Sequence, residues 1–96
     1  MEESEKKFLE ELKNYLDITW EDTRGDEKIL GMMKRGEAAI SGKIGKCDFS
    51  KDTPEKALLF IYVMYERAGE LDQFWKNYKE EIVSLQIDRK VDAYAG

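Results

Sequence analysis

The stretch that decides the fold is residues 52–67, which read Asp52-Thr53-Pro54-Glu55-Lys56-Ala57-Leu58-Leu59-Phe60-Ile61-Tyr62-Val63-Met64-Tyr65-Glu66-Arg67. Asp52 and Thr53 are residue types that cap a helix, and Pro54 suits the first helical position because no N–H donor is needed there. The side chains from Ala57 to Tyr65 are apolar, which predicts a central helix with almost no polar face. Such a helix must be covered on most sides, by the rest of the chain or by other copies of it.

The composition indicates one helical domain over residues 1–96. Hydrophobic residues make up 42% of the chain and charged residues 39%, with a single proline, which favours a folded helical domain over disorder. A chain of 96 residues buries only about 60–70% of the surface that its unfolded form exposes. We therefore expect modest stability, or stability that depends on partners.

Charge and hydropathy exclude several classes of function. The net charge is −5 and no long Lys/Arg block is present, which disfavours sequence-specific DNA binding. The apolar run Ala57–Tyr65 is shorter than the about 20 residues that cross a bilayer, so no membrane role is expected. Met1 is followed by Glu2, Glu3 and Ser4 rather than by a basic and then apolar leader, so we expect action in the cytoplasm or in something assembled there.

Apolar residues three and four positions apart predict an all-α bundle of about four helices around the central one. Trp20, in the first connection, is interpreted as a ring that seals the edge of the core. The expected helices lie near residues 4–16, 23–44, 54–68 and 71–85, followed by a weakly structured tail over 86–96.

Two glycines interrupt the second expected helix. Gly31 and Gly36 each cost about 1 kcal/mol relative to alanine inside a helix. Either the helix simply tolerates them, or another helix approaches closely at these positions, and the sequence leaves both interpretations open. The helix is expected to end by Gly42 or Gly45.

No residue pattern points to catalysis or to a cofactor. The chain has no histidine and one cysteine, so the usual zinc ligands are lacking, and nothing near Cys47 marks it as a nucleophile. The stretch from Gly36 to Lys43 is not a phosphate-binding loop, because Ile44 stands where Ser or Thr would hold magnesium. Adjacent carboxylates such as Glu80 and Glu81 face different sides of a helix. We therefore expect a binding or assembly protein that is not an enzyme, with no catalytic, metal or cofactor-binding residues.

The candidate surface for contact with another subunit or partner lies in the fourth helix and the tail. Its aromatic residues recur at helical spacing and could cover the central helix or a neighbouring subunit, and lasting interfaces are rich in such residues. The tail would fray alone but could dock as an extended arm. The candidate interface residues are Phe74, Trp75, Tyr78, Ile87, Arg89, Lys90 and Val91.

The order of these segments resembles the head-tail connector (adaptor) proteins of long-tailed phages. The likeness covers about Phe8 to Leu85 and rests on a pattern of helices rather than on an invariant signature. The opening is carried by Phe8-Leu9-Glu10-Glu11-Leu12-Lys13-Asn14-Tyr15-Leu16 and Trp20-Glu21-Asp22. The middle and end are carried by Ala39-Ile40-Ser41-Gly42-Lys43-Ile44-Gly45, the stretch from Ala57 to Arg67, Leu71-Asp72-Gln73-Phe74 and Tyr78-Lys79-Glu80-Glu81-Ile82.

The resemblance implies a structural subunit that forms a ring at the head-tail junction of a virion, assembled in the host cytoplasm. Its partners would be other copies of itself, the portal protein, the next head-completion or tail protein, and DNA that passes without sequence-specific binding. The C-terminal part of the family helps to dock the portal, which gives the tail from Gln86 a role. The alternative is a small cytosolic helical regulator, antitoxin-like or a phage inhibitory protein. Such a regulator would be a monomer or dimer with an exposed apolar face for one partner.

Overall fold

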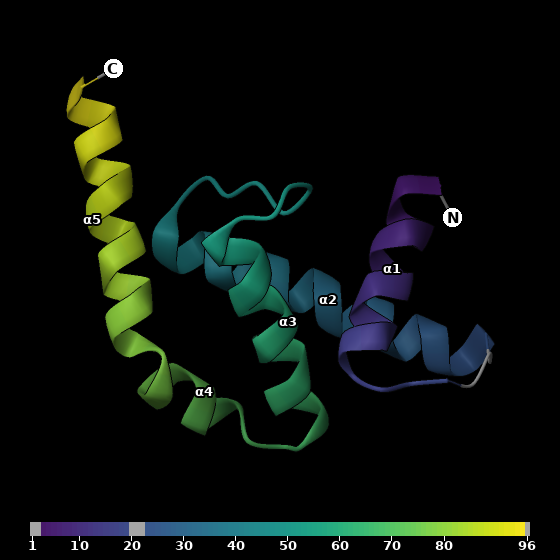
Figure 1. Cartoon of the computed structure of the whole chain (residues 1–96). Coiled ribbons are helices and arrows are strands. Elements are labelled where there is room, and N and C mark those ends of the chain that lie inside the picture. Colours follow the sequence, from purple (N-terminus) through teal and green to yellow (C-terminus); the bar gives the residue numbers. More distant parts are fainter. Residues whose placement is uncertain (1–2, 20–22, 96) are drawn as a thin grey trace.

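The fold is a two-layer arrangement of helices. The computed structural model describes residues 3–19 and 23–95, and the side chains of these residues except Ser4, Thr23 and 91–95. These residues contain no strand and form five helices: α1 (Glu3–Tyr15), α2 (Thr23–Ile44), α3 (Pro54–Arg67), α4 (Leu71–Asn77) and α5 (Lys79–Ala95) (Figure 1). The prediction of an all-α fold is confirmed, and within this part of the chain the helices number five rather than about four. None of the helices described is long and apolar enough to cross a membrane.

The ends of α3 follow directly from its sequence. The hydroxyl of Thr53 accepts a hydrogen bond from the Lys56 amide at 3.2 Å, and Pro54 is the first helical residue. Beyond Arg67 the chain reverses at Gly69, whose φ of 72° lies in the left-handed region that favours glycine. The Gly69 amide donates to the Glu66 carbonyl at 3.0 Å, so the helix end is closed.

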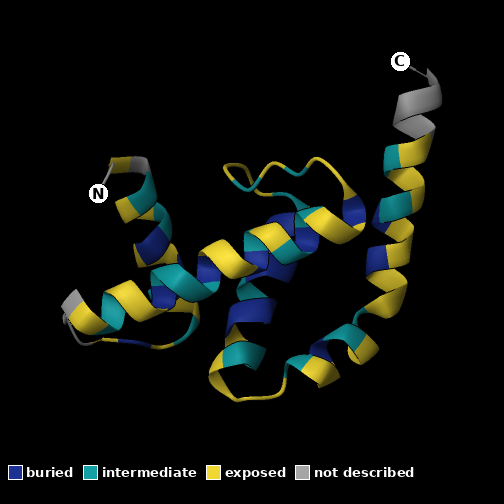
Figure 2. Ribbon diagram, turned by 180° about the vertical axis from the view of Figure 1, so that it is seen from behind, coloured by how far each residue is buried: buried dark blue, intermediate teal, exposed yellow. Residues whose placement is uncertain are grey.

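The core lies mainly between α2 and α3, and the buried residues of both helices are dark blue in Figure 2. The molecule measures 45 × 30 × 17 Å, and its thinnest dimension holds about two helices, each of which is about 10 Å across. Because α2 covers α3 from one side only, the opposite face of α3 stays open. The buried apolar residues are Leu9, Leu12, Ile18, Ile29, Met33, Ile40, Ile44, Leu58, Leu59, Tyr62, Val63, Phe74, Ile82 and Leu85.

The first helix closes one end of the core. Leu12 of α1 is fully buried, and the ring of Phe8 meets that of Phe60 on α3 edge-on, with 5.4 Å between centroids. The prediction that Trp20 seals the core edge falls outside the described residues. The contacts that place α1 are therefore those of its own apolar stripe.

The two glycines of α2 have different surroundings, which decides the question that the sequence left open. A Cβ on Gly36 would lie 2.6 Å from Leu59 Cδ1 and 2.8 Å from Tyr62 Cδ1, so α3 approaches closely there. A Cβ on Gly31 would meet only the end of the Arg35 side chain, at 3.3 Å. Gly36 therefore allows the contact between the two main helices, whereas Gly31 is tolerated.

Gly36→Ala is expected to destabilise the protein by about 1–3 kcal/mol, because the new methyl group overpacks against Leu59, which is fully buried. Gly31→Ala is the matched control, and it is expected to stabilise the same helix by about 0.5–1 kcal/mol. Urea unfolding of the two variants measures both changes. Stabilisation by both substitutions would contradict the close approach at Gly36.

The C-terminal region corrects two predictions. The helix predicted over 71–85 is two helices that meet at Tyr78, and the weakly structured tail predicted over 86–96 is wrong, because α5 continues to Ala95. Side chains of α5 bind the end of α2, where backbone carbonyls lack helical partners. Gln86 donates to the Lys43 carbonyl at 2.7 Å, and Arg89 donates to the Lys46 carbonyl at 2.9 Å. These tertiary contacts order a segment whose sequence pattern is weak.

Candidate functional site

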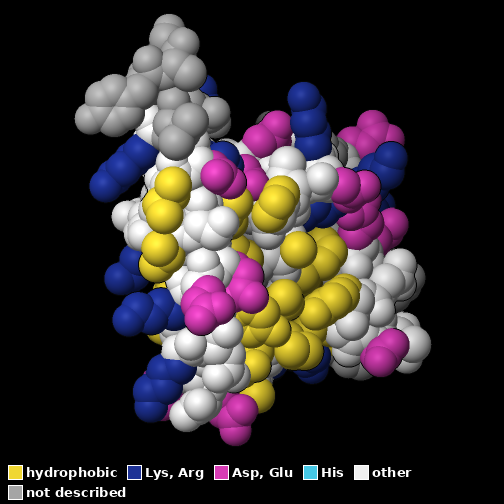
Figure 3. Space-filling model, turned by 60° about the vertical axis from the view of Figure 1, so that its left-hand side comes forward, with side chains coloured by type: hydrophobic (Ala, Val, Ile, Leu, Met, Phe, Trp, Pro, Cys, Tyr) yellow, Lys and Arg dark blue, Asp and Glu magenta, His cyan; other side chains and the backbone are white. Residues whose placement is uncertain are grey.

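The open face of α3 forms the floor of an apolar groove. Two adjoining hollows of about 380 and about 550 Å³ share Ala57 and Ile61, and together we call them the α3 groove. Phe60 and Ile61 are only half buried although they lie on the most apolar helix of the chain. Figure 3 shows hydrophobic side chains gathered on this face between α1 and α5. The apolar side chains of α3 that line the groove are therefore left partly exposed to solvent.

Acidic side chains border the α3 groove on both sides. On the α5 side the lining includes Glu80, Glu81 and Asp88, all of them exposed. On the α1 side it includes Glu11 and Asp52. Asp and Glu side chains lie along the hydrophobic patch in Figure 3. This arrangement favours a ligand that is apolar along its centre and basic at its edges.

Lys56 fixes the α1 side of the groove. Its ammonium group lies 2.7 Å from Glu11 of α1 and 3.4 Å from Asp52, and it sits over the rings of Phe8 and Phe60. The hydrogen bond to Glu11 raises the pKa of Lys56, so this side chain stays charged. The lysine therefore connects α1 to the first turn of α3 and partly neutralises that rim.

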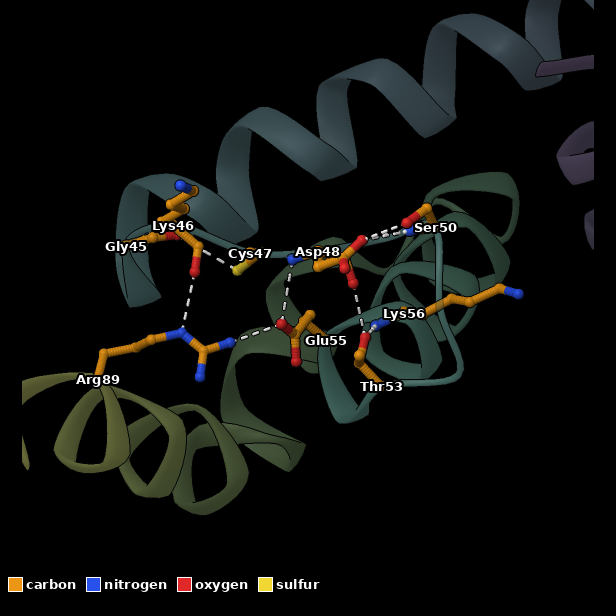
Figure 4. Close-up of polar contacts among 9 residues, drawn as sticks. All are labelled: Gly45, Lys46, Cys47, Asp48, Ser50, Thr53, Glu55, Lys56 and Arg89. Atoms are coloured by element: carbon orange, nitrogen blue, oxygen red, sulfur yellow. Dashed lines mark hydrogen bonds and ion pairs between the residues drawn. The ribbon is translucent and has the colours of Figure 1, made fainter. Parts of the chain in front are cut away.

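Arg89 and Glu55 fix the α5 side of the groove (Figure 4). Glu55, in the first turn of α3, is 4% exposed, and its carboxylate accepts from the Arg89 guanidinium and, at 3.2 Å, from the Asp48 amide. The same guanidinium donates to the Lys46 carbonyl. A buried carboxylate needs such partners, and here they join α5, α3 and the loop between α2 and α3.

The loop over residues 45–53 is held by its own side chains. The Ser50 amide donates to the Asp48 carboxylate at 2.9 Å, and the Thr53 hydroxyl donates to the Asp48 carbonyl at 2.8 Å. Cys47 is half buried, and burial raises the pKa of its thiol. The loop therefore provides a scaffold for α3 and α5.

A second surface lies on the outer side of α5. Val83 and Ile87 are 40% and 54% exposed, one helical turn apart, and the exposed Lys79 and Lys90 share their face. We call these four residues the α5 ridge. A strip of hydrophobic side chains with Lys and Arg beside it runs along α5 at the left of Figure 3. The exposed Glu80, three positions before Val83 and seven before Ile87, borders the ridge on its groove side. The ridge is thus apolar with a lysine at each end, whereas the groove is apolar and acidic.

The predicted interface residues do not form one surface. Phe74 is fully buried among the rings of Tyr62, Trp75 and Tyr78, so it is part of the subunit's own core and the prediction that it contacts a partner is corrected. The guanidinium of Arg89 is engaged within the chain.

The other predicted interface residues are spread over several surfaces. Trp75 is half buried, and Tyr78 lines the α3 groove, where burial raises the pKa of its hydroxyl. Ile87 and Lys90 lie on the α5 ridge. The side chain of Val91 lies outside those that the structure describes. Of the predicted interface residues whose side chains are described, only Ile87 and Lys90 are therefore exposed.

Sequence reasoning missed the two charged residues that position the groove. The sequence pattern assigns no role to Glu55 and Lys56, yet both are buried. A signal was present for Glu55, because it precedes Leu58, Leu59 and Tyr62 by three, four and seven positions and so shares their face of the helix. The sequence held no such signal for the partners, Glu11 and Arg89.

The described residues contain no group of side chains that could hold a metal ion. Comparison with family models, curated proteins and solved structures finds no match for this chain. The functional interpretation of the α3 groove therefore follows from its geometry and charge.

Proposed function

We propose that this chain is an assembly subunit that binds other proteins, and specifically a ring-forming adaptor between the portal and the tail of a phage virion. Other copies of the chain, the portal protein and the next head-completion or tail protein are its proposed partners. DNA passes through the ring without sequence-specific binding. The resemblance of segments from Phe8 to Leu85 to the connector family supports this role.

The observation that carries the proposal is the open apolar face of α3. A lone subunit leaves Ala57 and Met64 exposed and Phe60 and Ile61 half buried on this helix. Contiguous exposed apolar surface bordered by polar residues is typical of protein-binding sites. In the proposed ring, α3 is the central apolar helix of the subunit, and a neighbouring protein buries the face of α3 that the lone subunit leaves exposed.

The charge of the chain agrees with a channel role. A net charge of −5, repeated around a ring, repels the phosphate backbone and lets DNA slide rather than bind. We place the assembled ring at the head-tail junction of the virion, after synthesis in the host cytoplasm.

Light scattering of the purified chain across a concentration series, with and without the portal of a candidate phage, tests the proposal. We expect discrete ring-sized species, alone or on the portal. The adaptor function is contradicted if the chain stays a monomer or dimer and leaves the mass of every portal tested unchanged.

The second candidate is a small helical regulator that binds one helix of another protein. The observation that favours it is the shape of the α3 groove, since a groove between two helices accepts an amphipathic helix. In this case the same experiment gives a strict monomer or dimer that ignores the portal. The two candidates therefore make opposite predictions for one measurement.

A further inference from the structure

We propose that the occupant of the α3 groove is the α5 ridge of a second copy of this chain, so that subunits join head to tail. This inference rests on the proposed ring function and names the two surfaces that would build it. The groove lies over Ala57 and Ile61 of α3, and the ridge is centred on Val83 and Ile87 of α5.

The charges of the two surfaces are complementary. The α3 groove is bordered on the α5 side by Glu80, Glu81 and Asp88, whereas the two carboxylates on the α1 side are already paired with Lys56. The α5 ridge carries Lys79 and Lys90 on the same face as its apolar residues. An inserted ridge would bury apolar side chains on the floor and place its lysines beside carboxylates at the rim, which sets both partner and orientation.

The positions of the two surfaces favour a ring or a filament rather than a closed dimer. The α5 residues that line the groove are Glu80, Glu81, Ser84, Leu85 and Asp88. The buried Ile82 faces the core, and the ridge occupies the remaining side of the helix. A subunit whose groove is filled therefore still offers its own ridge. Such heterologous contacts continue from copy to copy and form a ring when the rotation closes.

The overall charge limits how strongly free copies associate. Each chain carries −5, so two copies repel at long range although the two surfaces attract locally. Weak association in solution, which strengthens when a template brings copies together, follows from this balance.

Disulfide trapping between matched cysteines tests the contact. In a Cys47→Ser background, Ala57→Cys places a thiol on the groove floor and Val83→Cys places one on the ridge. Under mild oxidation, a mixture of these two variants is expected to form the mixed dimer about tenfold faster than either variant forms its own dimer. The chain with both cysteines is expected to form a ladder of higher species. Ala38→Cys, at an exposed position of α2, replaces the ridge cysteine in the control mixture.

Charge reversal distinguishes this contact from nonspecific hydrophobic association. Lys79→Glu with Lys90→Glu in the ridge variant should slow trapping to the rate of the control mixture. Glu81→Lys with Asp88→Lys in the groove variant should restore it. Circular dichroism of each variant verifies that the helices remain folded.

The inference is overturned if the mixed dimer forms no faster than the control pair, or if either single-cysteine variant dimerises as fast as the mixture. Its failure is distinguishable from that of the proposed function, which is measured on the unmodified chain with the portal. Rings on the portal without specific trapping would leave the function standing and assign the contact to other surfaces.

Discussion

Phe74→Ala is expected to destabilise the subunit by about 3–5 kcal/mol, which is the usual cost of removing a buried aromatic ring. Phe74 is 0% exposed, and its ring lies 5.0 Å from that of Trp75 and 5.5 Å from that of Tyr62, centroid to centroid. The truncation would leave a cavity where α3 and α4 meet. Urea unfolding followed by circular dichroism measures the change.

Ile87→Ala is the matched control, because sequence reasoning placed Phe74 and Ile87 together in one interface. Ile87 is 54% exposed, so its truncation is expected to change the stability by no more than about 0.5 kcal/mol. A loss of stability below about 1 kcal/mol for Phe74→Ala would show that α4 does not pack on α3 as described.

Arg89→Glu is expected to destabilise the subunit by about 3 kcal/mol, because it leaves the buried carboxylate of Glu55 without its cation and adds a second negative charge beside it. For a domain of this size, such a loss lowers the thermal midpoint by more than about 10 °C. Lys90→Glu, at the next position, is exposed and is expected to stay within about 0.5 kcal/mol of the parent.

Thermal unfolding of the two variants checks the expected difference between the neighbours Arg89 and Lys90. The expected difference departs from the sequence-based prediction that both residues lie in a tail that docks as an extended arm. A midpoint for Arg89→Glu close to that of Lys90→Glu would mean that α5 is not anchored through Glu55.

The sequence was sufficient wherever local chemistry decides the structure. The start of α3 at Thr53 and Pro54 and the reversal at Gly69 follow from capping and glycine conformation, which act over a few residues. The all-α fold follows from apolar spacing. The sequence also identified Gly36 as a possible close contact, although it could not distinguish it from Gly31.

The rest depends on contacts between residues far apart in the chain. The order of α5 comes from carbonyls at the end of α2, and no pattern within residues 86–95 reports them. For the same reason, the predicted interface combines core residues with surface residues. An aromatic stripe has the same sequence spacing whether it packs in its own core or against a partner. Phe74 faces the core, whereas Ile87 faces outward.

The anchors of α5 also set an order in which the chain can fold. The bonds that hold α5 join residues far apart in the chain: 43 residues separate Gln86 from Lys43 and Arg89 from Lys46, and 34 separate Arg89 from Glu55. Closing these loops costs entropy, and it gives no stabilising contact until α2 and the start of α3 have formed. α2 and α3 can therefore pair before α5 docks on them. During that interval the whole α5 side of α3 is bare, and only the arrival of the C-terminal helix turns that bare helix face into a groove.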